Sequence, residues 1–296
     1  MATTKEKRQA LHDLLYAPGC TIAPSGFDAL SAMVIERAGF KAIHISGSSV
    51  HRSFGYPDVG LLTMHDQIAR ATQIADAVNL PVIGDGETGF GNVVNLVRAV
   101  REFERAGVAA IHIEDQETPK RPTHEGAEGS FISKDEFTGK IKAAVDTRAD
   151  DSFCIIARID ARAVESFDQV VERGMAACEA GADAIWMGLR VDDEMERITK
   201  IIPRPMVGVR RRARPGGKTY GEMGYKIGVV PGVLQSAAVW AMASVLKTML
   251  ETGDEMDFFG KLSDYDEPKA WLNAVGNAGV RDIETRYLNA TTLAPS

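Results

Sequence analysis

One short pattern occurs three times in the chain and constrains its fold more than any other feature. A predicted helix ending in Glu-Arg-Ala-Gly or Glu-Ala-Gly is followed each time by a short apolar strand, at residues 36–47, 104–115 and 179–188. Glycine tolerates the left-handed conformation that ends many helices, and such apolar runs are typical of buried parallel strands. The copies lie roughly 70 residues apart, which is about two helix-and-strand units each. This spacing predicts a barrel.

Eight short apolar strands alternate with helical segments along the chain. This order predicts an α/β fold, a (β/α)8 TIM barrel, whose chemistry lies at the C-terminal ends of the strands. A doubly wound sheet is the alternative, but no predicted strand is followed by Gly-x-Gly-x-x-Gly. We expect strands at residues 21–23, 41–46, 81–85, 108–113, 153–158, 184–188, 205–209 and 227–230, and helices at 63–78, 93–105, 133–149, 167–180 and 193–201.

The chain continues beyond what a barrel needs. A long apolar helix is expected over residues 234–251, and an amphipathic helix over residues 268–288. We therefore expect residues 1–296 to form one barrel domain with a C-terminal helical extension from about residue 234. The extra helices are expected to pack on a partner subunit, and closing the bottom of the chain's own barrel is the alternative.

Composition excludes several classes of protein. The net charge of -7 argues against a general nucleic-acid binder. The cysteines Cys20, Cys154 and Cys178 are too few and too scattered for a disulfide framework or a zinc site, and they suit a reducing compartment. The N-terminal residues predict a short amphipathic helix rather than a signal peptide, and no segment is expected to span a membrane. We expect a soluble, cytoplasmic protein.

Acidic residues stand at the expected ends of two adjacent strands. Asp85 and Glu87 follow the third strand, and Glu114 follows the fourth. Their carboxylates can converge on one hard divalent ion, which indicates Mg2+, with Mn2+ also possible. For Glu114 alone, a helix cap or a pair with a neighbouring lysine is an equally good interpretation.

Groups suited to an anionic substrate are expected beside these acids. Arg158 ends the fifth strand, and its guanidinium matches the two oxygens of a carboxylate. The backbone at Ser46 and Gly47, after the second strand, can bind the same group. Asp58 lies in the following loop and can reach this mouth of the barrel, although its position after a proline also suits a simple turn residue.

Two histidines occupy the same point in the repeated strand. His44 and His112 lie inside their predicted strands rather than at the ends. We therefore expect structural, hydrogen-bonded histidines rather than a paired metal site.

Five motifs in this order resemble the isocitrate lyase and phosphoenolpyruvate mutase superfamily, in its short-chain, methylisocitrate lyase-like group. They are Ser46-Gly47-Ser48, Asp85-x-Glu87-x-Gly-Phe-Gly, Ile113-Glu114-Asp115-Gln116, Pro119-Lys120-Arg121 and Ala157-Arg158.

The resemblance implies Mg2+ bound directly by Asp85 and through waters by Glu87 and Glu114. It also implies a 2-hydroxy or 2-oxo acid on the metal, with the substrate carboxylate against Ser46, Gly47 and Arg158 and with Asp58 near the reacting end. Residues 116–131 would form a mobile lid that excludes water. Members of the superfamily usually form tetramers in which a C-terminal helix is swapped, which implies a homotetramer here.

The lid departs from the pattern of the superfamily's lyases. Those lyases carry Lys-Lys/Arg-Cys-Gly-His, and their cysteine handles the proton exchanged with the departing carbanion. This chain has Lys120, Arg121, Pro122, Thr123 and His124 in the same place. Proline cannot transfer a proton, so we expect an altered donor, either His124, Thr123 or a water. Lys120 and Arg121 remain as further catalytic candidates.

Other positions also depart from the resemblance. Glu87 stands where an aspartate is usual, and Met187-Gly188 stands where lyases commonly have a glutamate. A basic run, Arg210 to Arg214, replaces a polar stretch after the seventh strand. This run is either a solvated loop or a receptor for a second acidic group of the substrate.

Stabilisation of an enolate is the step that these motifs share. The favoured function is a Mg2+-dependent carbon-carbon lyase acting on a 2-hydroxy or 2-oxo dicarboxylic acid. The alternatives are an oxaloacetate-type decarboxylase or hydrolase, which needs no lid cysteine, and a non-catalytic dicarboxylate-binding protein. Phosphonopyruvate chemistry is disfavoured, because that branch usually has Glu-Asp-Lys where this chain has Glu114-Asp115-Gln116.

Overall fold

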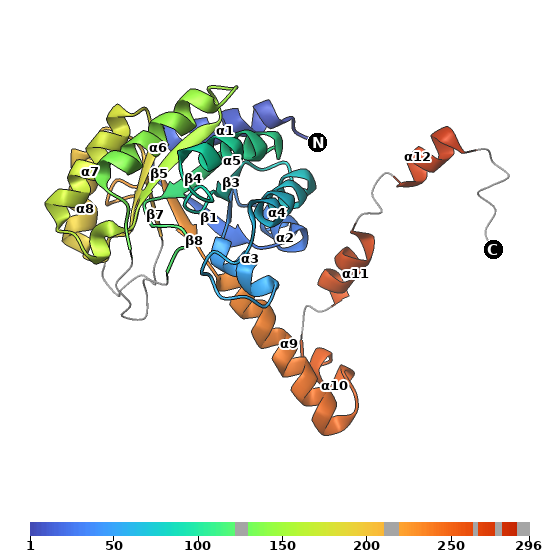
Figure 1. The fold of residues 1–296 in the computed structure, drawn as a ribbon. Coiled ribbons are helices and arrows are strands. Elements are labelled where there is room, and N and C mark those ends of the chain that lie inside the picture. The colour runs from blue at the N-terminus through green and yellow to red at the C-terminus, as the bar shows by residue number, and fades with distance from the viewer. Residues whose placement is uncertain (122–129, 210–218, 263–265, 276–279, 289–296) are drawn as a thin grey trace. The chain divides into compact units, whose positions relative to one another are not determined.

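Eight parallel strands close into a barrel in the computed structural model (Figure 1). Each strand pairs with the next one in the chain, and β8 pairs with β1, so the predicted (β/α)8 fold is confirmed. The structure describes residues 1–121, 130–209, 219–262, 266–275 and 280–288. The strands are β1 (Thr21–Gly26), β2 (Ile43–Ile45), β3 (Val82–Asp85), β4 (Ala110–Glu114), β5 (Cys154–Ile159), β6 (Ala184–Met187), β7 (Met206–Val209) and β8 (Ile227–Val230).

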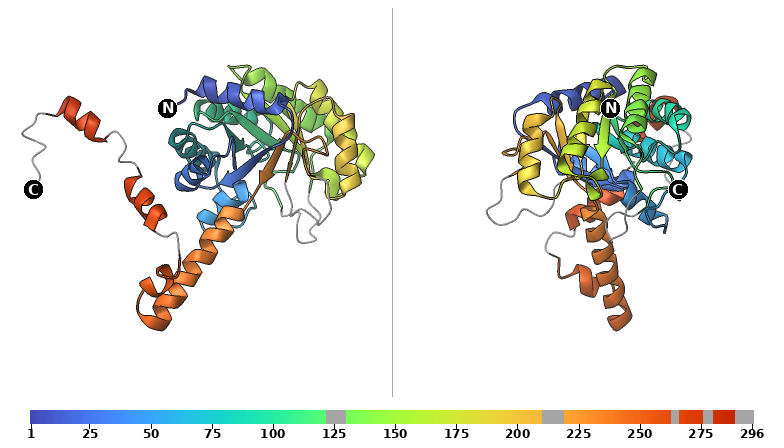
Figure 2. Two further views of the ribbon diagram at one scale, coloured as in Figure 1. Left: turned by 180° about the vertical axis from the view of Figure 1, so that it is seen from behind. Right: turned by 60° about the vertical axis from the view of Figure 1, so that its left-hand side comes forward.

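Helices surround the strands, as two further views show (Figure 2). Side-chain caps set the start of several of them, such as Thr63 before α4 and Ser166 before α7. The barrel helices are α1 (Thr4–Tyr16), α2 (Ala29–Arg37), α3 (Gly47–Ser53), α4 (Met64–Ala77), α5 (Val93–Arg105), α6 (Lys134–Thr147), α7 (Phe167–Glu179) and α8 (Asp192–Ile201), with a short 3-10 turn η1 (Ala161–Ala163).

The repeated pattern folds as its sequence predicts. Gly39, Gly107 and Gly181 end α2, α5 and α7, with φ values of 86°, 81° and 99°. These left-handed positions suit glycine, which has no Cβ to collide with the backbone. The next strand then begins within a few residues, at β2, β4 and β6. Each of the three copies therefore forms the same kind of connection, from the end of a helix into the next strand of the barrel.

Alternation along the strands sorts the side chains into layers inside the barrel. The residues nearest the N-terminal ends, such as Ile83, Ile156 and Val207, form one apolar cluster together with Leu11 and Leu15 of α1. Since neighbouring side chains of a strand point to opposite faces, the next inward positions after Ile83 and Ile156 are Asp85 and Arg158. Helix α1 thus covers the apolar end of the barrel, and charged groups occupy the other end.

The chain divides into two compact units, residues 1–236 and 237–296. The C-terminal helices are α9 (Val233–Thr252), α10 (Met256–Phe259), α11 (Asp266–Ala274) and α12 (Val280–Tyr287). The single helix expected over residues 268–288 is wrong in this form, because the structure has α11 and α12 there, and residues 276–279 between them lie outside the described part. Gly276 and Gly279 lower the helix propensity of that stretch.

Helix α9 exposes many apolar side chains. Trp240, Leu246 and Leu250 are 67%, 64% and 90% exposed. Among the described residues, α9 is also the one helix whose length and composition would allow a membrane crossing, which by itself is weak evidence for one. Packing against the barrel does not explain why α9 carries these apolar side chains.

Candidate active site

The charged end of the barrel is built by the last inward-facing residues of adjacent strands. Asp85 ends β3 and Glu114 ends β4, while Arg158 lies one residue before the end of β5. The parallel register places Glu114 directly beside Arg158. Asp85 and Glu114 are two of the three acids predicted to bind the metal, and Arg158 is the residue predicted to bind a carboxylate. All three therefore lie on neighbouring strands and face the interior of the barrel.

The backbone of Gly47 holds the Asp85 carboxylate. The Gly47 N–H donates to Asp85 Oδ2 at 2.9 Å, and the Glu87 N–H donates to Asp85 Oδ1 at 2.9 Å. A Cβ at residue 47 would collide with Asp85 Oδ2, so a larger residue there would force the carboxylate to move. Burial alone would raise the pKa of Asp85, but the basic groups around it outweigh this effect and keep the pKa below its ordinary value.

Helix α3 was not expected from the sequence, and it explains how Gly47 reaches this position. Ser46 caps the helix, with its Oγ accepting from the Ser49 N–H at 3.4 Å. The Ser46 and Ser48 hydroxyls lie 3.1 Å apart. The predicted anion-binding backbone is therefore the first turn of a short helix, whose N–H groups have no partners within the helix itself.

Glu87 reaches the same acidic cluster from a strained loop. Its φ is 53°, which is uncommon for a residue other than glycine, and its side chain is buried. Gln67 of α4 donates from Nε2 to Glu87 Oε1 at 3.0 Å. Burial raises the pKa of Glu87 to about 8, because the surrounding protein disfavours its charged form and three further carboxylates lie close by.

The Lys120 ammonium lies among the acids. Its Nζ is 2.8 Å from Asp58 Oδ1 and 3.6 Å from Glu114 Oε1, and it also pairs with Glu87 Oε2. Burial opposes the charge of Lys120, yet the carboxylates of Glu114 and Glu87 outweigh burial and raise its pKa well above the ordinary value. The lysine therefore supplies positive charge at the centre of the cluster.

The same oxygens fit a divalent ion. Asp58 Oδ1, Glu87 Oε2 and both carboxylate oxygens of Glu114 are buried, and among the described residues they face the charged groups of Lys120 and Arg158 rather than neutral donors. Buried carboxylates are costly unless a cation offsets their charge. Oxygen ligands of this kind suit Mg2+ or Mn2+, so the donor set agrees with the predicted metal.

A second set of possible ligands overlaps this one. Donor atoms of His51, Asp58 and Glu87 lie within 4.8 Å of one another. However, His51 Nδ1 lies 2.9 Å from the Gly47 carbonyl oxygen, and the Leu62 N–H points to Nε2 at 3.5 Å. These contacts assign the proton to Nδ1, which then donates to Gly47 and is not free to bind a metal.

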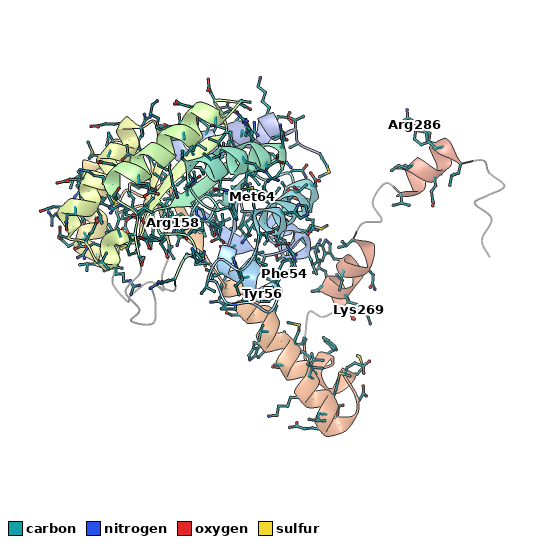
Figure 3. The ribbon with its side chains drawn as sticks, viewed as in Figure 1. Phe54, Tyr56, Met64, Arg158, Lys269 and Arg286 are labelled. Carbon is teal, nitrogen blue, oxygen red and sulfur yellow. The ribbon has the colours of Figure 1, made fainter. Side chains whose placement is uncertain are left out.

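Arg158 is held in place with one donor to spare. Its Nη1 lies 3.2 Å from Glu114 Oε2, its Nη2 lies 2.8 Å from Asp160 Oδ2, and its guanidinium stacks 4.9 Å above the Trp186 ring. The buried Nε has no acceptor among the described residues. Figure 3 labels Arg158 in the barrel, which is the unit of residues 1–236 and also carries Met64. A fixed guanidinium with an unused N–H is suited to binding a carboxylate.

The two strand histidines form a chain below the charged groups. His44 Nδ1 lies 2.7 Å from Ser25 Oγ, and the Nε2 atoms of His44 and His112 lie 3.0 Å apart. Burial lowers the pKa of His44 to about 4, so the ring is neutral near pH 7. The expectation of structural, hydrogen-bonded histidines is confirmed.

A cavity of about 370 Å3 adjoins Glu87 and Lys120. It lies where the loop before α4 meets the loop after β3, and its wall includes the apolar side chains of Leu61, Met64 and Phe90. The site is therefore polar on its barrel side and partly apolar on this side.

Among the described residues, Arg121 is a predicted site residue that is exposed rather than buried with the cluster. Pro122, Thr123 and His124 lie outside the described residues, and so does the basic run from Arg210 to Arg214.

Several residues at the site were not indicated by the sequence patterns. His51, Gln67, Asp160 and Trp186 all contact predicted site residues. For Gln67 a signal was available, because this polar residue stands in the apolar stripe of α4.

A closed parallel barrel with carboxylates and an arginine at the C-terminal ends of its strands defines the class of protein: a TIM barrel with clustered acidic and basic groups at that end. Residues 11–250 match the family model described as phosphoenolpyruvate phosphomutase. The chain therefore belongs to this family, in the phosphoenolpyruvate mutase and isocitrate lyase superfamily, as the sequence motifs predicted.

Individual relatives match over most of their length. A 2,3-dimethylmalate lyase of Eubacterium barkeri is 40% identical over 287 residues, which cover 94% of this chain and 96% of that protein. A 2-methylisocitrate lyase of Aeropyrum pernix is 36% identical, over 85% of this chain and 82% of that protein. A crystal structure of phosphonopyruvate hydrolase with oxalate and Mg2+ superposes with a TM-score of 0.84 at 32% identity, covering 98% and 100% of the two chains.

Proposed function

We propose that this protein is a Mg2+-dependent lyase that cleaves a carbon-carbon bond of a 2-hydroxy or 2-oxo dicarboxylic acid. One observation carries the proposal: the buried carboxylates of Glu87 and Glu114 lie beside Arg158, whose buried Nε has no acceptor among the described residues. Such a site can hold a cation and a carboxylate next to each other. The names of the relatives, 2,3-dimethylmalate lyase and 2-methylisocitrate lyase, support this choice of reaction.

Each residue has a task that follows from its contacts. Asp85, Glu87 and Glu114 would hold the metal, and Gly47 would keep Asp85 oriented towards it. Bound there, Mg2+ would supply positive charge that stabilises the enolate anion left by bond cleavage. Arg158 would bind the substrate carboxylate, together with the backbone at the start of α3.

Asp58 and Lys120 would act at the reacting end of the substrate. Their side chains form an ion pair at 2.8 Å, and Lys120 is buried while Asp58 keeps partial access to solvent. Such a pair can orient a substrate hydroxyl and pass its proton. Ser46 and Ser48, whose hydroxyls lie 3.1 Å apart, would face the carboxylate end.

The proton that the enolate takes up must come from a group other than a cysteine. None of Cys20, Cys154 and Cys178 lies within residues 116–131. Cys154 and Cys178 are also buried, and burial raises the pKa of the Cys178 thiol to about 11. We propose His124, Thr123 or a bound water as the donor, with Lys120 and Arg121 helping to position it.

We also propose the ligand class, the partners, the location and the oligomeric state of the protein. We infer a small 2-hydroxy or 2-oxo carboxylic acid as the ligand, no nucleic-acid or membrane partner, a cytoplasmic location and a homotetramer. The chain's acidic balance and its relatives' metabolic substrates support the first two points. We also propose that residues 1–296 work as one barrel domain with a helical extension.

The test is a mass-spectrometric screen of the purified protein with Mg2+ against a panel of branched and linear 2-hydroxy and 2-oxo dicarboxylates. Asp85→Ala is the control, since it removes the carboxylate that Gly47 and Glu87 hold. We expect wild type, and not this variant, to split one substrate into two carbon fragments. Release of CO2 with a shortened 2-oxo acid would instead favour a decarboxylase, and binding without turnover would favour a dicarboxylate-binding protein.

A further inference from the structure

Gln67 is a buried polar residue in an otherwise apolar helix face. It lies 3% exposed in the first turn of α4, and the buried positions that follow are Ala71, Ile74 and Ala75. This spacing is the stripe by which α4 packs against the barrel. Burying an amide costs free energy unless it is hydrogen-bonded. The Gln67 amide therefore needs a hydrogen-bond partner that offsets the free-energy cost of its burial.

Its partner is one oxygen of Glu87. Gln67 Nε2 donates to Glu87 Oε1 at 3.0 Å, and both side chains are buried. The other oxygen, Oε2, pairs with the Lys120 ammonium. One carboxylate oxygen is thus held by a neutral amide, while the other faces positive charge.

The backbone conformation of Glu87 is one reason why its side chain needs the hydrogen bond from Gln67. Its φ of 53° belongs to a loop conformation that few residues adopt, and its side chain has more rotatable bonds than that of Asp85. Asp85 is held by two backbone N–H groups. The Glu87 carboxylate instead accepts from the side chain of Gln67 at Oε1 and pairs with Lys120 at Oε2.

We propose that Gln67 is a positioning residue for the metal site, which anchors Glu87 Oε1 so that Oε2 faces the bound cation. The inference rests on the proposed role of Glu87 in holding that cation. Gln67 Nε2 also lies 3.4 Å from His51 Nδ1, but that nitrogen donates to the Gly47 carbonyl oxygen, so the effect of Gln67 on the site is assigned to its hydrogen bond with Glu87. Outer groups that orient metal-binding residues typically change metal affinity by about 10- to 100-fold when removed.

The experiment is a double-mutant cycle read by calorimetric titration of EDTA-stripped protein with Mg2+. Gln67→Met keeps the shape of the side chain and removes the donor, and Glu87→Asp shortens the carboxylate so that it no longer reaches residue 67. We expect Gln67→Met to weaken Mg2+ binding about 10-fold when residue 87 is Glu, and to have little effect when residue 87 is Asp. Thr72→Val is the matched control, because Thr72 lies on the same helix and its hydroxyl donates to the Ile68 carbonyl of that helix.

Thermal unfolding in EDTA separates positioning from packing. If Gln67 serves only the packing of α4, Gln67→Met will lower the melting temperature and leave Mg2+ affinity unchanged, which overturns the inference. A loss of affinity that is equal with and without the Glu87→Asp substitution also overturns it. A wild type that binds no Mg2+ would overturn the proposed function together with the inference, whereas wild-type binding with an unaffected Gln67→Met variant overturns the inference alone.

Discussion

At the scale of single residues, the site depends on positions where one atom more or less decides the geometry. Gly47 is the clearest case, because its N–H holds Asp85 and its missing Cβ leaves room for that carboxylate. We expect Gly47→Ala to weaken Mg2+ binding about 10-fold or more, because Asp85 must move away from the added methyl group. Calorimetric titration with Mg2+ measures the change.

Gly139 provides the control for that substitution. It lies exposed on α6, and a Cβ there would meet nothing within 4 Å. Gly139→Ala is expected to leave Mg2+ binding unchanged and to stabilise the protein by up to about 1 kcal/mol, since alanine favours helices more than glycine. Equal Mg2+ affinity in Gly47→Ala and wild type would contradict the role assigned to Gly47.

Asp150 illustrates a residue whose charge acts on stability away from the site. Hydrogen bonds from Ser152 and then from Arg8 lower its pKa to about 2, and Arg8 Nη1 lies 2.6 Å from Asp150 Oδ2. An unfolded aspartate has a pKa of about 3.9, so the folded form binds fewer protons between about pH 4 and pH 2. The stabilisation is therefore complete above about pH 4 and is lost as the pH falls to 2.

Replacing Asp150 by Asn should remove this pH dependence. Because the carboxylate is 38% exposed, solvent screens the ion pair and the expected loss at pH 7 is about 1 kcal/mol or less. Chemical denaturation at several pH values should show the difference between wild type and variant shrinking from about pH 4 to pH 2. A difference that stays constant over that range would contradict this explanation.

At the scale of elements, α7 secures the base of the segment that carries Lys120. Arg173 donates from Nη1 to the Ile132 carbonyl at 2.9 Å and lies 3.6 Å from Asp115 Oδ2. The Ile132 N–H in turn donates to the Asp115 carbonyl at 3.0 Å. Both ends of residues 116–131 are thus tied to one helix, which fixes where Lys120 enters the barrel.

We expect Arg173→Met to destabilise the protein by about 3 kcal/mol. The substitution leaves the fully buried Asp115 without its cation, although burial already raises the pKa of Asp115 to about 7 and protonation can limit the cost. Urea unfolding measures the loss, and Lys134→Ala is the control. Its pair with Glu172 is largely exposed, so that variant should lose less than about 1 kcal/mol, and equal losses would contradict the buried clamp.

Elements with strong patterns were predicted well, and short irregular ones were not. Helix α5 and strand β8 have the boundaries that their apolar spacing predicted, because packing and local propensity agree there. Helix α3 was missed, because it is a single short helix in a Ser- and Gly-rich stretch without an apolar stripe. Helix α3 depends on the cap by Ser46 and on the hydrogen bond from Gly47 to β3. Local sequence patterns do not indicate such a contact between distant residues.

At the scale of the whole molecule, the exposed apolar face of α9 supports assembly into an oligomer. We expect the full chain to sediment as a tetramer, and the double variant Trp240→Glu, Leu250→Glu to sediment as smaller species. Both side chains are more than half exposed, and covering them with another subunit would remove apolar surface from water. Lys247→Ala on the same helix is the control, and a monomeric wild type would contradict the prediction.

The site as a whole was partly predictable from the sequence. Asp85, Glu114 and Arg158 were found because each ends an apolar run, and alternation along a strand then decides which way each side chain points. The supporting residues were not found, because the partner of Gln67 lies 20 residues away and is fixed only by the closure of the barrel. Asp160 was overlooked as a partner of Arg158 for the same reason.

The layers inside the barrel separate the tasks of folding and chemistry. Apolar side chains such as Ile83 and Ile156 form the floor with α1, while the charged rim lies one inward position further along the same strands. Between them, His44 and His112 bond to each other and to Ser25. The rim and the floor are therefore formed by different residues of the same strands. In such a barrel, evolution or laboratory design can substitute rim residues to alter substrate preference while the apolar residues of the base are kept.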